Sequence, residues 1–177
     1  MKKEIFIHLS FLISIFIFIS LFKGWMSFSY WPFWVGGIVG NFLPELDHFI
    51  YIYFLRPHEL TSQRVSYMLG KKEILRSLNL LARTRSERTK LIFHTAGFQL
   101  IFLVLTFLVI TSSGSLLGRG LVLAFSLHLL IDQVVDLMEI GNLDNWFREL
   151  PITLNNELRK GFFILMLLVF LLFAFLL

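Results

Sequence analysis

The chain contains no cysteine, and charged residues are scarce. Without cysteine it can form no disulfide and offers no thiolate to a metal ion, so a metal site would have to use nitrogen and oxygen ligands. Only 16% of the 177 residues are charged, whereas 56% are hydrophobic and 21 are phenylalanine. Because this balance is far too apolar for an ordinary soluble domain, it predicts an integral membrane protein.

The common catalytic signatures are also missing from the sequence. It contains no CxxC, no H-E-x-x-H and no Ser-centred nucleophile elbow. The glycine cluster at residues 36–40 lacks the lysine and the context of a phosphate-binding loop. Any chemistry must therefore be sought in polar residues placed within the apolar segments.

Apolar segments of spanning length divide the chain and predict an all-α bundle of five transmembrane helices in a single domain, residues 1–177. The predicted spans are residues 5–22, 30–55, 91–110, 116–138 and 161–177, with loops at 56–90 and 139–160. The first span could be a signal peptide, but no small-x-small cleavage site follows it, which favours an uncleaved anchor. Pro44 predicts a break in the second span, and nearby glycines predict a close helix neighbour.

The basic residues predict the orientation of the spans. The loop 56–90 is strongly basic, and with the N-terminus inside, 14 Lys and Arg residues fall on the cytoplasmic side against two outside. This asymmetry predicts a cytoplasmic N-terminus and an external C-terminus. Apolar residues at helical spacing within 74–82 indicate either an amphipathic helix on anionic lipid or a plain cytoplasmic loop with helical content.

Ionisable residues interrupt the second, third and fourth predicted spans. Each costs about 2.5–3.5 kcal/mol at membrane depth on insertion scales, so such residues need partners. They are Glu45, Asp47 and His48 in the second span, His94 in the third, and His128, Asp132 and Asp136 in the fourth. Helical rise places all of them in the cytoplasmic half, and the last three form one helical stripe. We therefore expect the second and fourth spans to pack around one polar site that His94 joins.

Histidine and carboxylate side chains are the ligands that zinc, manganese and iron take where thiolates are absent. The predicted metal ligands are Asp47, His48, His94, His128 and Asp132. Glu45 and Asp136 are the predicted catalytic carboxylates. His8 is interpreted as a packing residue and His58 as solvated. The expected cofactor is a divalent metal, zinc first with manganese or iron as alternatives, and the reaction class that it suits is hydrolysis.

Residues 36–136 resemble a family of bacterial inner-membrane metal-dependent hydrolases, often called LexA-binding or LexA-regulated. That family has a Pro-Asp-x-Asp-His motif, which is similar to residues 44–48 with Glu45 in place of the first Asp. Its later His-x-x-x-Asp element is similar to residues 128–132. In its intervening His-Arg-Gly-x-Thr-His segment only the last His has a counterpart, His94, since Thr89 and Lys90 stand at the first two positions.

The resemblance implies a bacterial inner-membrane location and a metal-dependent hydrolase of a lipid-linked ester or phosphoester. The predicted depth of the polar residues places its action at the cytoplasmic face. The expected partners are membrane lipids and such a substrate, and no nucleic acid is expected. The alternative is a non-enzymatic transport or interaction protein, in which the same buried groups carry protons or ions or fix helix packing.

Overall fold

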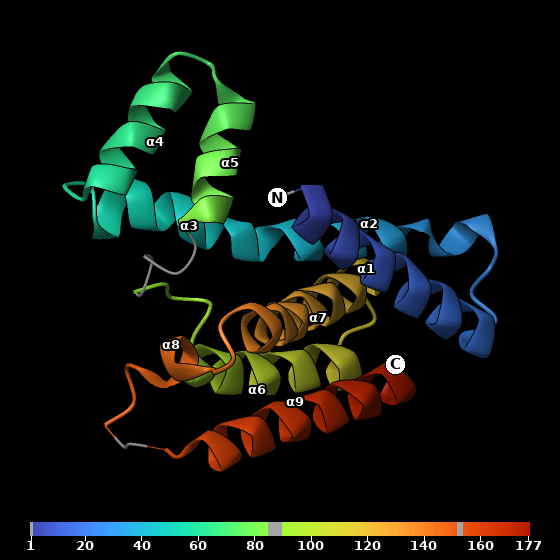
Figure 1. Cartoon of the computed structure of the whole chain (residues 1–177). Helices are drawn as coiled ribbons and strands as arrows, with labels where there is room; N and C mark the ends of the chain where they lie inside the picture. Colours follow the sequence, from blue (N-terminus) through green and yellow to red (C-terminus); the bar gives the residue numbers. More distant parts are fainter. Residues whose placement is uncertain (1, 85–89, 152–153) are drawn as a thin grey trace.

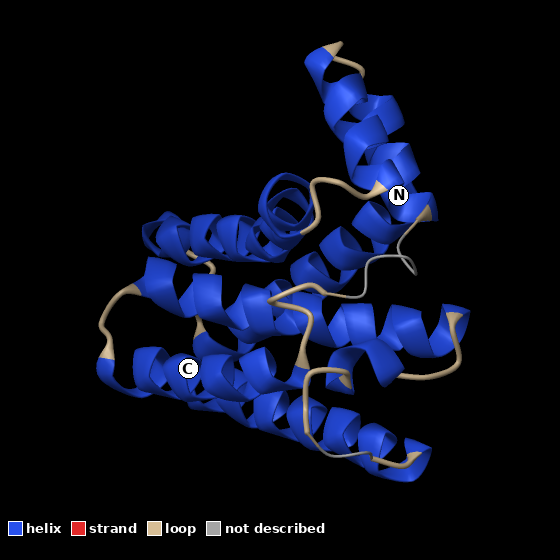
Figure 2. Cartoon of the chain, turned by 90° about the vertical axis from the view of Figure 1, so that its left-hand side faces the viewer, coloured by secondary structure: helices blue, strands red, loops and turns tan. Residues whose placement is uncertain are grey.

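The computed structural model describes residues 2–84, 90–151 and 154–177, and every regular element in these ranges is a helix (Figures 1 and 2). The main helices are α1 (Lys2–Lys23), α2 (Trp31–Phe42), α3 (Leu46–Ile50), α4 (Leu60–Gly70), α5 (Ile74–Arg83), α6 (Ala96–Ser112), α7 (Leu116–Glu139), α8 (Asp144–Phe147) and α9 (Asn156–Leu176). The all-α prediction is confirmed. The parts of the two predicted loops at 85–89 and 152–153 lie outside the described residues.

Three of the described helices are long and apolar enough to cross a membrane, not the five predicted. They are α1 from residue 4 onward, α7 and α9. The predicted third span fails on length, because α6 has 17 residues. The predicted second span is not one regular helix, since α2 continues through a 3-10 turn (Leu43–Glu45), α3 and a π-helical turn (Tyr51–Leu55).

Pro44 explains where α2 ends. Its ring nitrogen carries no hydrogen, so the α-helical ladder cannot continue through it, and the backbone tightens into the 3-10 turn at that point. The stretch still runs on in the same general direction along the bundle (Figure 1). The break that the sequence predicted here therefore places Glu45 at the end of an irregular turn and Asp47 in the first turn of the helix that follows it.

The contact between α2 and α7 is close enough to exclude side chains. A Cβ added to Gly36 would lie 2.0 Å from the carbonyl oxygen of Leu117, and one added to Gly40 would lie 2.1 Å from that of Leu121. Gly120 of α7 meets Phe33 in the same way. Because glycines on both helices let the backbones touch, α2 lies directly on α7, as the glycine spacing predicted.

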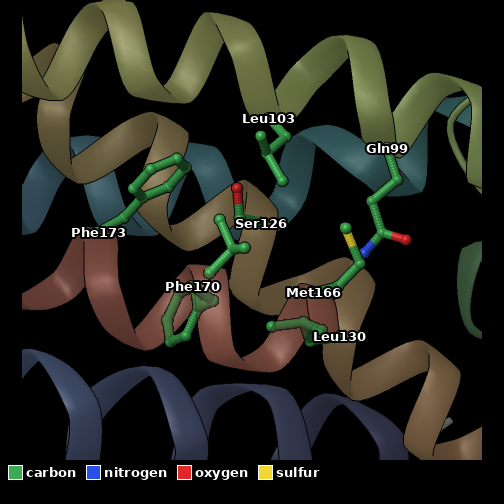
Figure 3. A pocket seen from close by; sticks show the side chains of 8 residues that line it. Gln99, Leu103, Ser126, Leu130, Met166, Phe170 and Phe173 are labelled. Carbon is green, nitrogen blue, oxygen red and sulfur yellow. The ribbon is translucent and has the colours of Figure 1, made fainter. Parts of the chain in front are cut away.

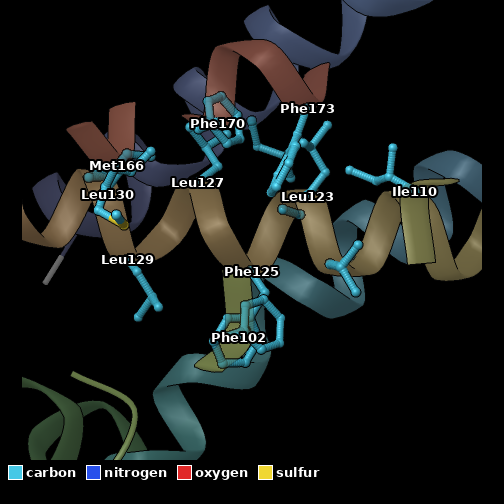
Figure 4. Packing of buried hydrophobic residues seen from close by; sticks show 14 of the residues in the cluster. Phe102, Ile110, Leu123, Phe125, Leu127, Leu129, Leu130, Met166, Phe170 and Phe173 are labelled. Carbon is cyan, nitrogen blue, oxygen red and sulfur yellow. The ribbon is translucent and has the colours of Figure 1, made fainter. Parts of the chain in front are cut away.

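Helix α7 is the centre of the molecule. Its residues are buried on almost every side, and Leu123, Phe125 and Leu127 pack against residues of α6 and α9 (Figure 4). The side chains of α1, α6 and α9 are far more exposed, with large apolar residues on their outer faces. A helix enclosed by apolar neighbours is therefore the scaffold from which His128, Asp132 and Asp136 project.

The segment predicted as a basic loop contains a hairpin of two helices, α4 and α5, so the amphipathic helix expected at 74–82 is present as α5. The hairpin has its own small core of Ile52, Val65 and Leu81. It projects from the end of the bundle at which α3 finishes and α9 begins (Figure 1). The loops on either side of α8 lie at the same end, as the predicted orientation requires (Figure 1).

Candidate metal centre

Asp47 anchors the segment that leads into α6. Its side chain is fully buried, and its two carboxylate oxygens accept the backbone N–H groups of Ile92 (2.9 Å), Phe93 (2.6 Å) and His94 (3.3 Å). These amides are free to donate because α6 starts only at Ala96, behind the N-cap Thr95. Asp47 therefore fixes the position of His94 relative to the α2–α3 stretch.

His94 bridges two carboxylates. Its Nδ1 donates to Oδ2 of Asp47 at 3.0 Å, and its Nε2 donates to Oδ2 of Asp132 at 2.8 Å. Since an ionised carboxylate only accepts, this geometry makes His94 a donor from both nitrogens, that is, an imidazolium. In this arrangement neither nitrogen of His94 presents a lone pair to an ion, and the side chain orients Asp132 instead.

His8, His128 and Asp132 form a buried cluster that could hold a metal ion. One potential ligand atom from each residue lies within 4.8 Å of the other two. Nε2 of His8 is 3.4 Å from Oδ1 of Asp132, and Nε2 of His128 is 3.2 Å from Oδ2. The two histidine rings face each other with centroids 4.1 Å apart. Helices α1 and α7 thus supply two imidazoles and a carboxylate at one point.

The nitrogens of this cluster fit a ligand role. Nδ1 of His8 donates to the carbonyl oxygen of Glu4 at 2.9 Å, which leaves Nε2 as the nitrogen with the lone pair. That Nε2 and both ring nitrogens of His128 are buried with no hydrogen-bond partner among the described residues. Buried polar atoms are nearly always satisfied, so these imidazole nitrogens around a carboxylate could serve as ligands of a cation.

Glu45 lies on the outer side of the cluster. One carboxylate oxygen is 3.6 Å from Nε2 of His128, and the other is 3.7 Å from Nε2 of His48. Its side chain is 48% exposed, whereas that of Asp132 is 3% exposed. His48 stacks on the His94 ring with centroids 5.5 Å apart. Of the charged groups at the cluster, Glu45 is therefore the one that a molecule outside the bundle could reach.

Asp136 has a different environment. Its Oδ2 accepts the indole N–H of Trp146 at 2.7 Å, which fastens α8 to the end of α7. The Trp146 ring in turn lies edge-on to His94, with centroids 5.8 Å apart. Asp136 thus positions the Trp146 ring beside His94. The structure does not bring it together with His8 and His128.

A separate small pocket lies between α6, α7 and α9 (Figure 3). Its volume of about 20 Å³ corresponds to about one water molecule. Gln99 and Ser126 supply its polar lining among apolar side chains, and no charged residue lines it. This pocket therefore has neither the size nor the charge to hold a substrate.

The sequence predictions and the structure overlap at most of the site but not at His8. Asp47, His94, His128 and Asp132 come together as expected, with His48 and Glu45 beside them. His8 was interpreted as a packing residue because it stands alone in an apolar run. The available signal was its depth, which matches that of the other histidines. Comparison with protein families, with curated proteins and with solved structures finds no match to this chain.

Proposed function

We propose that this chain is a membrane-embedded metal-dependent hydrolase with its metal ion held by His8, His128 and Asp132. The observation that carries the proposal is the convergence of these three buried side chains with orphaned imidazole nitrogens. Two histidines and one carboxylate are a common ligand set for catalytic zinc, which keeps a fourth position open. Manganese and iron accept the same donors.

The surrounding charges favour a cation at this position. Asp132 contributes a carboxylate to the cluster, Glu45 contributes another beside it, and Asp47 contributes a third behind His94. Among the described residues, His94 provides positive charge there through its two donated hydrogen bonds. A divalent ion next to the buried Asp132 carboxylate would offset its negative charge in a setting where unpaired charge is costly.

Each neighbouring residue has a task in the proposed reaction. His94, held by Asp47, orients Asp132 by donating a hydrogen bond to its Oδ2. Metal-binding carboxylates are commonly held in this way by residues outside the ligand set. A metal ion held by His8, His128 and Asp132 would supply a coordinated water whose pKa is lowered to about 7. Glu45, exposed and adjacent to His128, would be placed to accept the proton of that water. Asp136 supports the site by holding Trp146.

The surface around Glu45 supports an amphiphilic substrate. Its neighbours along the same helical stretch, Phe42, Leu46 and Phe49, are exposed apolar side chains. A molecule that approaches Glu45 along this stretch therefore crosses apolar surface before reaching a carboxylate. Such a path suits a lipid-linked ester or phosphoester whose polar group reaches the cluster while its chain stays in the bilayer. The resemblance of residues 44–48 and 128–132 to membrane hydrolases points to the same reaction class.

The alternative is a proton or ion pathway through the same groups. The observation that favours it is the unbroken hydrogen-bonded series from Asp47 through His94 to Asp132, which would pass a proton between carboxylates without a metal. In that case the cluster would bind no transition metal with useful affinity, and transport rather than hydrolysis would be the activity.

Metal content separates the two functions. We expect purified protein, equilibrated with zinc, manganese or iron and then desalted, to retain about one transition-metal ion per chain, as a three-ligand site would. His128→Ala should lose the ion. His58→Ala is the matched control, because His58 is an exposed histidine outside the cluster, and it should keep the ion. Wild-type protein that retains no metal would favour the pathway alternative.

A further inference from the structure

The tip of the α4–α5 hairpin carries a patch that is both apolar and basic. The patch consists of Tyr67, Lys71, Lys72, Ile74, Leu75 and Arg76, all of them exposed. The side chain of Leu75 is 70% exposed, that of Tyr67 64% and that of Ile74 57%, although large apolar side chains are usually buried. The buried core of the hairpin uses other residues, Ile52, Val65 and Leu81. The apolar side chains of the tip are therefore left on the surface.

The charge of the tip is strongly one-sided. The tip carries three basic residues, Lys71, Lys72 and Arg76, and one acidic residue, Glu73, which Arg76 contacts at 3.2 Å. The ammonium of Lys71 lies over the Tyr67 ring, 4.4 Å from the ring centroid, so a basic and an aromatic side chain are in direct contact at the tip. Basic side chains interleaved with exposed leucine, isoleucine and tyrosine are the composition of helices that lie in the interface of an anionic membrane.

The position of the hairpin agrees with that role. Figures 1 and 2 show it projecting from one end of the bundle at a large angle to the long helices, with the tip furthest from the bundle. That end is the one at which α3 finishes and α9 begins (Figure 1). If the apolar helices cross the bilayer, the hairpin extends along the membrane surface beside the bundle, and its tip lies over lipid.

We propose that the tip patch docks on anionic lipid head groups at the membrane surface next to the bundle. Leu75 and Ile74 enter the boundary between head groups and acyl chains, and Lys71, Lys72 and Arg76 bind the lipid phosphates. Each basic residue near an anionic surface strengthens such binding about fivefold, so the three together contribute about 100-fold to the docking equilibrium. This proposal does not depend on the cluster of His8, His128 and Asp132.

The absence of cysteine from the chain permits a direct test. A fluorophore on Leu75→Cys reports contact with lipid when the full-length protein is reconstituted in vesicles that contain lipids brominated in the acyl chain. We expect quenching in vesicles of phosphatidylcholine mixed with phosphatidylglycerol, and much less in phosphatidylcholine alone. Leu60→Cys is the matched control position, because Leu60 is an equally apolar residue, 62% exposed, at the base of the hairpin. It should show little quenching in either vesicle.

Charge variants complete the test. Lys71→Gln, Lys72→Gln and Arg76→Gln together should abolish the quenching at Leu75→Cys. The matched triple variant Arg64→Gln, Arg83→Gln and Arg148→Gln removes as much charge from exposed positions outside the tip and should preserve it. The proposal is overturned if Leu75→Cys is unquenched in the anionic vesicles, if it is quenched equally without phosphatidylglycerol, or if both triple variants lose the signal alike.

Discussion

Asp132 connects three parts of the chain through one carboxylate. Oδ1 faces His8 of α1, while Oδ2 accepts from His94 and lies 3.2 Å from His128. Removing this carboxylate would leave the His94 charge buried with one partner fewer, which costs about 3–5 kcal/mol in comparable buried pairs. Substitutions at Asp132 would therefore mix loss of folding with loss of function. Glu45, which is half exposed, offers a cleaner experiment.

Glu45→Gln should remove the proton acceptor while leaving the fold and the metal ligands in place. We expect hydrolysis of an amphiphilic ester or phosphoester to fall about 100- to 10,000-fold, the usual contribution of a positioned general base. Metal content should not change, because Glu45 is outside the three-residue cluster. Turnover and metal content are measured on the same preparation. Glu149→Gln, at another exposed carboxylate, is the control and should retain full activity. Full activity in Glu45→Gln would rule out the assigned base.

The sequence could predict the inner part of the site but not its full ligand set. The high cost of charge at membrane depth identified Asp47, His94 and Asp132, because such residues must find one another. It could not separate ligands from supporting residues, since that difference depends on which atoms face inward. His8 was missed because it is the single histidine of the first apolar run, and a lone histidine in such a run is more often a packing or hydrogen-bonded residue than a ligand.

Among the elements, the contact between α2 and α7 depends on the absence of side chains at the glycines. Gly40→Ala would place a Cβ 2.1 Å from the backbone carbonyl of Leu121, which cannot move without displacing α7. We expect a destabilisation of about 1–3 kcal/mol, as for other overpacked interiors. It should appear as a lower midpoint of thermal unfolding in detergent.

Gly161→Ala is the control for this substitution. Gly161 lies in the exposed first part of α9, and an added Cβ meets no atom within 4 Å. Replacing glycine by alanine in a helix then stabilises by up to about 1 kcal/mol. Equal midpoints for the two variants would show that the close approach of α2 and α7 does not limit stability.

Helix boundaries near the site escaped prediction for a physical reason. The predicted third span begins at residue 91, yet α6 begins at Ala96 because Asp47 takes the amides of Ile92, Phe93 and His94. Those amides would otherwise enter the first turn of the helix. The competing partner is 45 residues away from Ile92 in the chain, so no local pattern reveals it. Helix α7 follows its predicted span closely, because the side chain of Ser115 caps its N-terminus at the predicted boundary.

In the whole molecule, charge is divided between the two ends of the bundle. Lys23 and Arg119 are at the end opposite the hairpin, where they donate to the carbonyl oxygens of Phe175 and Leu177 and hold the end of α9. The Lys and Arg residues of α4 and α5 are at the other end (Figure 1). This polarity supports the predicted orientation, with the hairpin on the cytoplasmic side.

Single cysteines can test that orientation in intact cells. Gly70→Cys lies at the hairpin, and Gly114→Cys lies in the turn between α6 and α7; an added side chain at either position meets nothing within 4 Å. We expect a membrane-impermeant maleimide to label Gly114→Cys from outside and Gly70→Cys only after the membrane is opened. Labelling of both from the same side would contradict the predicted topology and the cytoplasmic position of the cluster.

The hydrogen bond between Asp47 and His94 joins residues that are synthesised several seconds apart. His94 follows Asp47 by 47 residues, and Asp132 follows His94 by a further 38. At about 5–20 residues per second, a ribosome needs roughly 2–10 s to reach His94 after Asp47 has been made. During that interval the aspartate has neither its histidine nor the three amides that surround it in the finished protein. During synthesis the α2–α3 stretch therefore exposes an unpaired Asp47 carboxylate until residues 92–94 have left the ribosome.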